Sequence, residues 1–488
     1  MEFNISILKH KLMDIKYGTS GFRYHSNIIF SIAKKIGKSI AKLSLQHNMS
    51  FGIMITASHN SYHYNGVKIV DTMGDMIDRD KEYNLEIDVN HNIDSIKIDK
   101  SLLEQKNYHT IFVGRDTRDS GYSIFKEIEK GIHLISEHIQ CLDLGIVSTP
   151  EHHFLVHHKN KVPYLSLYNN QYTNQYNRDI IHVDCANGVG YLVLEKLSMK
   201  HIITHNTDVL TQQSINHLCG SDYVLSNSTL NYKLEKNTLG CSLDGDADRI
   251  IYYFRNSDDK LCILDGDYIA ILYITFLIKH VKIDTKQISV GYVFSPYTNK
   301  KIVSYMKTID NHIHCECAGV GVKKLIAKSK QYDICVYFES NGHGSIVYNL
   351  SKIKTIQNLD YVLNINNMIV GDGINSIFLV KYMLSELKYD HTKWYSLVHK
   401  NPFELYKIRC RSRFSFVTTK TEDRLIEPYE LQDDIDHLIK THTDNNLFIF
   451  VRPSGTENVI RIYIESDSET LNQEIKIKMN HQLFNYIL

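Results

Sequence analysis

The stretch "CSLDGDADRIIYYF", residues 241–254, is the most informative part of the sequence because it places three aspartates in a short loop between two strand-like runs. Asp244, Asp246 and Asp248 alternate with small residues. Three carboxylates this close repel one another, and burying them without partners is costly. A divalent cation would remove that cost, and oxygen-only ligands favour Mg²⁺ or Mn²⁺ over zinc. A solvated acidic turn is the alternative interpretation of this loop taken alone.

The calcium-binding EF-hand does not fit this loop. Its sixth position would be Arg249, where glycine is needed, and its twelfth would be Arg255, where glutamate is needed. The strand-like flanks also contradict a helix on either side of the loop.

A second loop, in "MITASHNSYHYNGVK" (54–68), places Ser58 and His59 directly after an apolar, strand-like run. Lys68 follows ten residues after the serine. The residues alone leave open whether Ser58 is a turn residue or a reactive one.

The stretch "VRPSGTENVIRIY" (451–463) is rich in groups that bind phosphate. Arg452 offers a planar fork, Ser454 and Thr456 offer hydroxyls, and Gly455 lets backbone N–H groups approach closely. Each charge-assisted hydrogen bond contributes roughly 1.5–3 kcal/mol. We therefore predict a phosphate monoester site here, with a polar hairpin loop as the alternative.

Two further kinds of loop carry candidate ligand-binding groups. Glu339, Asn341 and His343 follow a buried strand in "VYFESNGHGS" (336–345) and suit sugar hydroxyls, although Asn-Gly is also ordinary turn chemistry. The sequences "YGTSGFR" (17–23) and "VGRDTRDSG" (113–121) add arginines beside glycines that could neutralise phosphate. These arginines are Arg23, Arg115 and Arg118, and for Arg118 a surface ion pair is an equally good interpretation.

The composition limits the partners of the chain. Lysine plus arginine equals aspartate plus glutamate at 55 each, so no net charge favours nucleic acid or a membrane surface. Nine scattered cysteines predict reduced thiols in the cytosol. The longest apolar run, 268–278, is too short for a membrane span and predicts a buried helix that begins near 265–267. With no targeting signal, we expect a cytoplasmic protein; no feature indicates a protein partner.

Strand-like and helical runs alternate along the chain, which predicts an α/β fold. Boundaries are expected in the polar stretch 168–178, near 290 and within 388–405. The predicted domains are 1–172, which carries the active serine; 173–290, which binds the metal; 291–390, which binds the sugar; and 391–488, which binds phosphate.

Four motifs in this order, "TASHN", "DGDADR", "ESNGHG" and "RPSGTE", resemble those of the α-D-phosphohexomutase superfamily. Within it the chain most resembles the phosphoacetylglucosamine mutase family. "TASHN" precedes "GRDTR", whereas most other members carry the arginine motif first. Asn341 also stands where many relatives acting on plain glucose or mannose phosphates carry serine.

The resemblance implies three related α/β domains and a smaller C-terminal α+β phosphate-binding domain around a central cleft. It implies that Ser58 is phosphorylated and completes the coordination of one Mg²⁺ by Asp244, Asp246 and Asp248. The implied roles of the neighbouring residues are proton transfer for Lys68, charge stabilisation for Arg249 and positioning of the phosphoserine for His59. The implied substrate-binding residues are Thr19, Arg23, Glu339, Asn341, His343, Arg452, Ser454, Gly455, Thr456 and Arg461.

The implied activity interconverts N-acetylglucosamine 6-phosphate and 1-phosphate for UDP-N-acetylglucosamine synthesis. It passes through a 1,6-bisphosphate, which also serves as the activator. Three features depart from the family pattern: Ser61 and Asp119 stand where proline is usual, and 318–325 lacks a threonine and a histidine. The alternatives are a phosphoglucomutase or phosphomannomutase of the same superfamily, a Mg²⁺-dependent sugar phosphatase, and an inactive sugar-phosphate-binding homologue.

Overall fold

The structure, a computed structural model, describes residues 15–19, 21–91, 109–168, 179–211, 213–454 and 458–486. The chain divides into two compact units, one of residues 1–263 with 361–381 and the other of residues 264–360 with 382–488. Most of the polar stretch at the first predicted boundary lies outside the described residues, as do Gly455 and Thr456. The three boundaries between the predicted domains and the central cleft stay predictions.

The first sheet of the first unit has the strand order β1-β3-β2-β4-β5. Its strands are β1 (Phe22–His25), β2 (Phe51–Ile55), β3 (Tyr64–Val70), β4 (Thr110–Arg115) and β5 (Gln140–Ile146). β2, β4 and β5 run parallel, whereas β3 is antiparallel to both β1 and β2.

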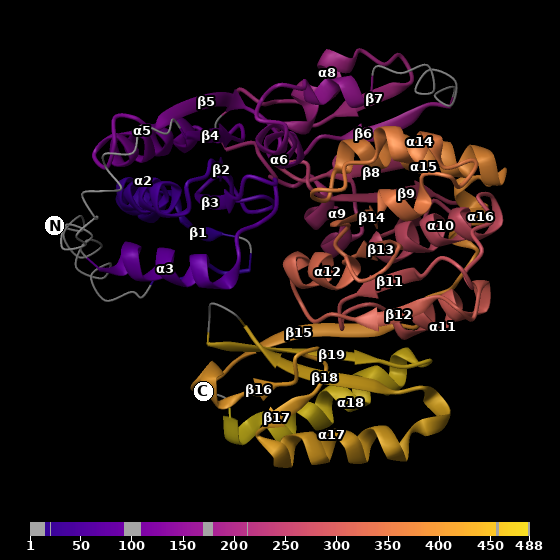
Figure 1. Cartoon of the computed structure of the whole chain (residues 1–488). Helices are drawn as coiled ribbons and strands as arrows, with labels where there is room; N and C mark the ends of the chain where they lie inside the picture. The colour runs from indigo at the N-terminus through magenta and orange to yellow at the C-terminus, as the bar shows by residue number, and fades with distance from the viewer. Residues whose placement is uncertain are drawn as a thin grey trace. The chain divides into compact units, whose positions relative to one another are not determined.

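Helices cover both faces of this sheet. Phe51, Ile53 and Ile55 of β2 belong to a core that α2 (Ser26–His47) and α5 (Ser120–His133) complete, and these two helices lie side by side in Figure 1. Met54 points to the other face, toward α6 (Thr149–His157). Because successive side chains of a strand point to opposite faces of the sheet, β2 contributes side chains to two cores.

His152 of α6 is buried against the sheet, where Gly52 and Gly114 leave room for its ring. Its Nε2–H donates to the carbonyl of Phe112 at 3.1 Å, and its Nδ1 has no hydrogen-bond partner among the described residues. Burial lowers the pKa of His152 from 6.5 to about 3, because a second proton would bring an unsolvated charge into the core. His152 is therefore a core residue.

The low pKa of His152 predicts an acid-sensitive fold. An unfolded histidine takes up a proton as the pH falls below 6.5, whereas folded His152 does so only near 3, so stability is lost as the pH falls through this window. We expect the free energy of unfolding to fall by about 2 kcal/mol from this residue between pH 7 and pH 5. The free energy of unfolding would be measured by urea unfolding at both pH values. The decrease between pH 7 and pH 5 should be smaller in His152→Gln than in wild type, but unchanged in His133→Gln, because His133 is exposed. Equal pH dependence in the two variants would contradict this account.

The second sheet has the order β10-β9-β8-β6-β7, and the third, in the second unit, has the order β12-β11-β13-β14. The strands of the second sheet are β6 (Ile181–Asp184), β7 (Ile202–His205), β8 (Gly240–Leu243), β9 (Ile250–Arg255) and β10 (Leu261–Leu264). Those of the third are β11 (Val290–Phe294), β12 (His314–Cys317), β13 (Ile334–Phe338) and β14 (Gly344–Tyr348).

The three sheets share one pattern: three parallel strands in a row, the last of which pairs with an antiparallel strand. In the order of the row the strands are β5-β4-β2 with β3, β7-β6-β8 with β9, and β12-β11-β13 with β14. Among the four strands of this pattern, the antiparallel pair comes last along the chain in the second and third sheets (β8 and β9, β13 and β14), whereas it comes first in the first sheet (β2 and β3). This order is why the loop after β2, with "TASHN", precedes the loop after β4, with "GRDTR".

The fourth sheet, β15-β19-β18, is antiparallel, with a separate β16–β17 pair. The strands of the sheet are β15 (Phe403–Arg409), β18 (Phe448–Pro453) and β19 (Val459–Glu465), and those of the separate pair are β16 (Val417–Thr418) and β17 (Leu425–Glu427). Helices α17 (Tyr429–Thr441) and α18 (Glu469–Gln482) contribute to its core and lie on one side of the sheet in Figure 1. The predicted fold class, α/β with a smaller α+β C-terminal domain, is confirmed.

The remaining α-helices of the described residues lie between strands along the chain. They are α3 (Arg79–Asn90), α8 (Gly190–Leu197), α9 (Ser221–Asn227), α10 (Gly266–Lys279), α11 (Lys300–Ile309), α12 (Val322–Ser329), α13 (Leu350–Ile353), α14 (Asp360–Ile365), α15 (Gly373–Leu387) and α16 (His391–Tyr395). α10 is the buried helix expected from the apolar run at 268–278, and Asp265 caps it by accepting from the N–H of Asp267 at 3.2 Å.

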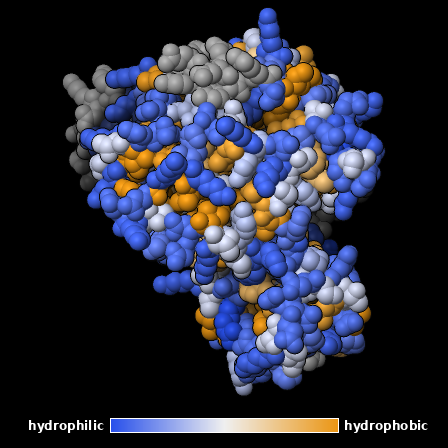
Figure 2. All heavy atoms as spheres, turned by 90° about the vertical axis from the view of Figure 1, so that its right-hand side faces the viewer, coloured by the Kyte–Doolittle hydropathy of each residue, from blue (hydrophilic) through white to orange (hydrophobic). Residues whose placement is uncertain are grey.

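Figure 2 shows a face on which polar residues predominate and apolar residues form several separate groups. Among the described helices, none combines the length and the apolar character that crossing a membrane requires.

Candidate active site

Ser58 lies in the loop after β2, is 1% exposed and has a left-handed backbone with φ of +52°. Its N–H donates to Thr56 Oγ1 at 2.9 Å. Its carbonyl accepts from Arg118 Nη2 at 3.2 Å and from Asn216 Nδ2 at 2.9 Å. Non-glycine residues seldom adopt positive φ, and such strain persists only where surrounding contacts hold it. The serine is thus fixed in place by its own backbone contacts.

The three aspartates lie in the loop between β8 and β9 and are all buried. One ligand oxygen from each lies within 4.8 Å of the others. The Ser58 hydroxyl donates to Asp244 Oδ2 at 2.7 Å, although 186 residues separate the two. Gly245 makes this approach possible, because a Cβ there would lie 2.8 Å from the Ser58 carbonyl oxygen.

The electrostatics of this cluster suit a bound cation. Burial, followed by the charges of Asp246 and Asp248, raises the pKa of Asp244 well above its ordinary value. Asp246 Oδ1 is buried and has no hydrogen-bond partner among the described residues. A divalent cation held by oxygens would relieve both features, so the residues present fit Mg²⁺.

Lys68 of β3 reaches the same carboxylates. Its Nζ lies 2.7 Å from Asp246 Oδ2 and 2.9 Å from Asp248 Oδ2. Burial acts to lower the pKa of Lys68, but the two aspartates outweigh it and raise the pKa. A role as proton acceptor needs a lowered pKa, so in this arrangement the ammonium form is the one that Lys68 holds.

Arg249, His59 and Arg23 form the rest of the charged surroundings. Arg249 Nε lies 3.9 Å from Asp244 Oδ2 and 3.8 Å from Asp248 Oδ1. His59 Nδ1 lies 3.5 Å from Ser58 Oγ, and the charge of Arg249, then burial, then Arg23 lower its pKa to about 2. His59 is therefore a neutral imidazole at physiological pH. Burial and the charge of Arg249 also lower the pKa of Arg23. Thr19 lies in an exposed turn before β1.

Several residues of the site were not predicted from the sequence. Thr149 Oγ1 donates to Asp246 Oδ2 at 2.6 Å, and the Thr149 N–H donates to the Asp246 carbonyl at 3.0 Å. Asn216 holds the Ser58 carbonyl. The signal for Thr149 was the sequence "STP" at 148–150, which begins α6. No local pattern marks Asn216.

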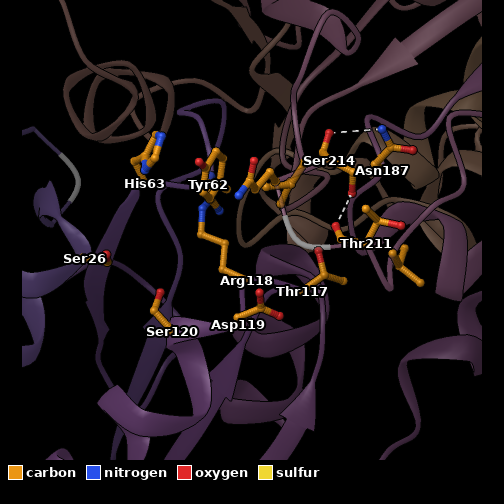
Figure 3. A pocket seen from close by; sticks show the side chains of 13 residues that line it. Ser26, Tyr62, His63, Thr117, Arg118, Asp119, Ser120, Asn187, Thr211 and Ser214 are labelled. Atoms are coloured by element: carbon orange, nitrogen blue, oxygen red, sulfur yellow. Dashed lines mark hydrogen bonds between the residues drawn. The ribbon is translucent and has the colours of Figure 1, made fainter.

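The two arginines of "GRDTR" differ in role. Arg118 forms an ion pair with Asp116, as the alternative interpretation had it, but the pair is buried rather than at the surface. Arg115 pairs with Asp143 at 2.6 Å. Arg118 also lines a pocket beside the serine loop, where its side chain lies between Tyr62 and Asp119 in Figure 3. Apart from Arg118, the lining residues were not candidates in the sequence.

The candidate sugar-binding residues lie in the second unit, in the turn between β13 and β14. The Glu339 N–H donates to the His343 carbonyl at 2.9 Å, and the His343 N–H donates to Asn341 Oδ1 at 3.0 Å. Glu339 Oε1 accepts from the N–H of Gly321 at 3.3 Å, which ties this turn to the 318–325 segment.

The candidate phosphate-binding residues lie on β18, β19 and the connection between them, also in the second unit. Arg452 and Arg461 are directly paired across these strands. Ser454 is buried, and its N–H donates to the Val459 carbonyl at 2.8 Å. Arg452 Nε forms an ion pair with Glu422 Oε2 at 2.8 Å.

Comparison with known proteins agrees with this fold. The phosphoglucomutase/phosphomannomutase α/β/α domain I matches residues 39–95 and 97–193, and the C-terminal domain of that family matches 419–482. Phosphoacetylglucosamine mutase domain III matches 265–389. The chain is therefore a phosphohexomutase.

The similarity to one family within this class extends over nearly the whole chain. Phosphoacetylglucosamine mutase of Homo sapiens is 30% identical over 500 residues, 93% of this chain and 91% of that protein. The enzyme of Candida albicans is 31% identical, with 94% of each chain covered. The structure of Aspergillus fumigatus N-acetylphosphoglucosamine mutase in complex with GlcNAc-6P and magnesium has a TM-score of 0.88, with 28% identity over 98% of both chains. The chain belongs to the phosphoacetylglucosamine mutase family, as its motifs indicated.

Proposed function

We propose that this chain interconverts N-acetylglucosamine 6-phosphate and N-acetylglucosamine 1-phosphate, with Ser58 as the phosphoryl carrier. The observation that carries the proposal is the 2.7 Å contact between the Ser58 hydroxyl and Asp244, within a buried cluster of three aspartates. Related structures hold the corresponding ligands: the Aspergillus enzyme binds GlcNAc-6P and magnesium, and an alanine variant of it binds glucose 1,6-bisphosphate.

The chemistry assigned to Ser58 is transfer rather than hydrolysis. In the first half-reaction the O1 hydroxyl of the 6-phosphate attacks phosphorus, the bond from phosphorus to Ser58 Oγ breaks, and a bisphosphate forms. In the second, the freed Ser58 hydroxyl attacks the 6-phosphoryl group and the sugar 6-hydroxyl leaves. Each step exchanges one P–O bond for another and moves one proton, so the enzyme ends phosphorylated as it began. A sugar 1,6-bisphosphate would supply the first phosphoryl group.

Asp244, Asp246 and Asp248 would hold Mg²⁺ together with an oxygen at Ser58. The cation, when bound, supplies positive charge that stabilises the transferring phosphoryl group. Arg249, within 4 Å of two of these carboxylates, supplies a further fixed positive charge. Neutral His59 lies close enough to orient the hydroxyl or its phosphate.

We assign proton transfer to Lys68. Its ammonium form can return a proton to a leaving oxygen, and accepting one requires its contacts with Asp246 and Asp248 to weaken. Lys68→Gln is expected to lower kcat by roughly 10²–10⁴-fold, the range typical of a lost general acid or base. The matched control is Lys381→Gln, since Lys381 is also buried but donates to the Asp179 carbonyl instead. Similar kcat values for the two variants would contradict the assignment.

The remaining residues are assigned to substrate binding. Glu339, Asn341 and His343 would contact sugar hydroxyls, while Arg452, Ser454 and Arg461 would bind the phosphate that is not being transferred. Thr19, Arg23, Gly455 and Thr456 keep the substrate-binding roles that the resemblance implies. N-acetylglucosamine specificity rests on the family to which the chain belongs and on Asn341.

A panel of sugar phosphates tests the function. The 6-phosphates of N-acetylglucosamine, glucose and mannose should each be assayed with and without a sugar 1,6-bisphosphate. We expect the highest kcat/KM for N-acetylglucosamine 6-phosphate and a requirement for the bisphosphate. Faster turnover of glucose or mannose phosphate would favour the other mutases of the superfamily. Release of inorganic phosphate without isomerisation would identify a phosphatase instead.

A further inference from the structure

Glu422 places one carboxylate between two cations of the second unit. Its Oε2 lies 2.8 Å from Arg452 Nε, and its Oε1 forms an ion pair with Lys324 Nζ. The side chains of Glu422 and Arg452 are only 14% and 11% exposed, whereas that of Lys324 is 48% exposed. The arginine is thus bound on one side by a carboxylate that also holds a half-exposed lysine.

The turn between β16 and β17 presents Glu422 in a fixed position. Glu422 has a φ of +60°, and its N–H donates to the Thr419 carbonyl at 3.1 Å. Thr421 Oγ1 donates to Asp423 Oδ1 at 2.5 Å, and Thr419 Oγ1 donates to the same oxygen at 3.3 Å. These local hydrogen bonds therefore hold the turn in place around Glu422, whose positive φ is uncommon for a residue other than glycine.

This turn packs closely against the 318–325 segment, which departs from the family pattern. A Cβ at Gly319 would lie 2.8 Å from the carbonyl oxygen of Lys420 and 3.4 Å from Lys324 Nζ. Only a residue without a side chain fits there, and Gly319 has a φ of +81°. The lysine and the glutamate are therefore brought together by two ordered segments rather than by chance contact of long side chains.

Arg452 and Lys324 each contact one oxygen of the Glu422 carboxylate, and a phosphate group could be bound by two cations in the same way. Arginine and lysine are the usual phosphate ligands, and charge-assisted hydrogen bonds to them are strong. Glu422 gives the trio a net charge of about +1. A phosphate dianion in place of the carboxylate would interact more strongly with both cations, because its charge is about twice as large.

We propose that Glu422 occupies the position of a sugar phosphate in the free enzyme, and that an incoming phosphate displaces it from Arg452 and Lys324. Lys324 is then a second, newly assigned cation of the phosphate site. The inference rests on the proposed function only in taking Arg452 as a phosphate ligand. Displacement by the substrate makes this carboxylate a competitor that sets the affinity for phosphate.

The test measures phosphate affinity without catalysis. Inorganic phosphate would be titrated calorimetrically, without Mg²⁺, into the full chain carrying Ser58→Ala, alone and with Glu422→Gln, Lys324→Gln or both. We expect Glu422→Gln to lower the Kd for phosphate roughly tenfold, because one competing charge is lost, and Lys324→Gln to raise it by a similar factor. In the double variant, Glu422→Gln should lower the Kd for phosphate by a smaller factor than it does in the presence of Lys324.

The matched control is Glu404→Gln, which breaks an ion pair with Lys476 at 2.8 Å in the same domain and should leave the Kd unchanged. An unchanged or higher Kd in Glu422→Gln, with an unchanged thermal unfolding temperature, would show that Glu422 positions Arg452 and would overturn the proposal. An unchanged Kd in Lys324→Gln would overturn the assignment of Lys324. Failure of the proposed mutase activity would appear instead in the substrate panel, since phosphate binding here involves no turnover.

Discussion

Ser58→Ala is expected to abolish the interconversion, with a loss of at least roughly 10³-fold in kcat, because it removes the hydroxyl proposed to carry the phosphoryl group. The hydroxyl at 58 is buried, and its contact with Asp244 at 2.7 Å is the one through which the serine joins the acidic cluster. Removing a single oxygen leaves the backbone contacts of the loop in place, so the thermal unfolding temperature should change little. Purified variant and wild type would be compared in the mutase assay with added bisphosphate.

Ser61→Ala serves as the matched control, because Ser61 is an exposed residue of the same loop. It should retain most of the activity. Intact-mass analysis after incubation with a sugar 1,6-bisphosphate should find one added phosphoryl group on wild type and on Ser61→Ala, but none on Ser58→Ala. Substantial turnover by Ser58→Ala, or phosphate found on a different residue, would exclude Ser58 as the carrier.

Asp246→Asn is expected to raise the Mg²⁺ concentration needed for half-maximal rate by roughly 100-fold or more. Removing a residue that only supports a metal ligand already lowers metal affinity or activity by about 10–100-fold. Asp246 offers a buried oxygen that has no hydrogen-bond partner within the part of the chain that the structure describes, and its other oxygen accepts from Thr149 and Lys68. Burial and Asp248 act to raise the pKa of Asp246, yet its contacts with Lys68 and Thr149 lower it, so the carboxylate stays charged. The measurement is the Mg²⁺ concentration that gives half-maximal rate.

The control for this experiment is Asp258→Asn, in the exposed turn between β9 and β10. Its Mg²⁺ dependence should match that of wild type. If Asp246→Asn also matched wild type, the aspartate would not be a metal ligand, and the cluster would be a structural feature that Lys68 neutralises.

Strong local patterns let much of the fold be predicted from the sequence. The uninterrupted apolar run at 268–278 predicted α10, whose first residue, Gly266, lies within the expected range of 265–267. The strand-like run before Ser58 corresponds to β2, and it and the start of α10 were recognisable because apolar runs and capping residues act over a few positions. The resemblance implied three related α/β domains, but the strand order that the three sheets share is not a local pattern, because pairing joins residues far apart along the chain.

The site could be predicted only as a set of separate loops. The motif order named the residues, but the partners that hold them come from distant segments: Asn216 at the Ser58 carbonyl and Thr149 at Asp246. The raised pKa of Lys68 also could not be foreseen, because it depends on two aspartates about 180 residues away. Sequence reasoning predicts residue types well and long-range electrostatic balance poorly.

The anchoring of the Ser58 carbonyl by Arg118 and Asn216 has a consequence for how the two half-reactions follow each other. Both donors also hold the carbonyl of Asn60, so the backbone on either side of His59 is tethered at two points. A nucleophile so restrained cannot swing from one end of a hexose to the other. Between the two transfers, the bisphosphate itself must therefore be the body that rotates.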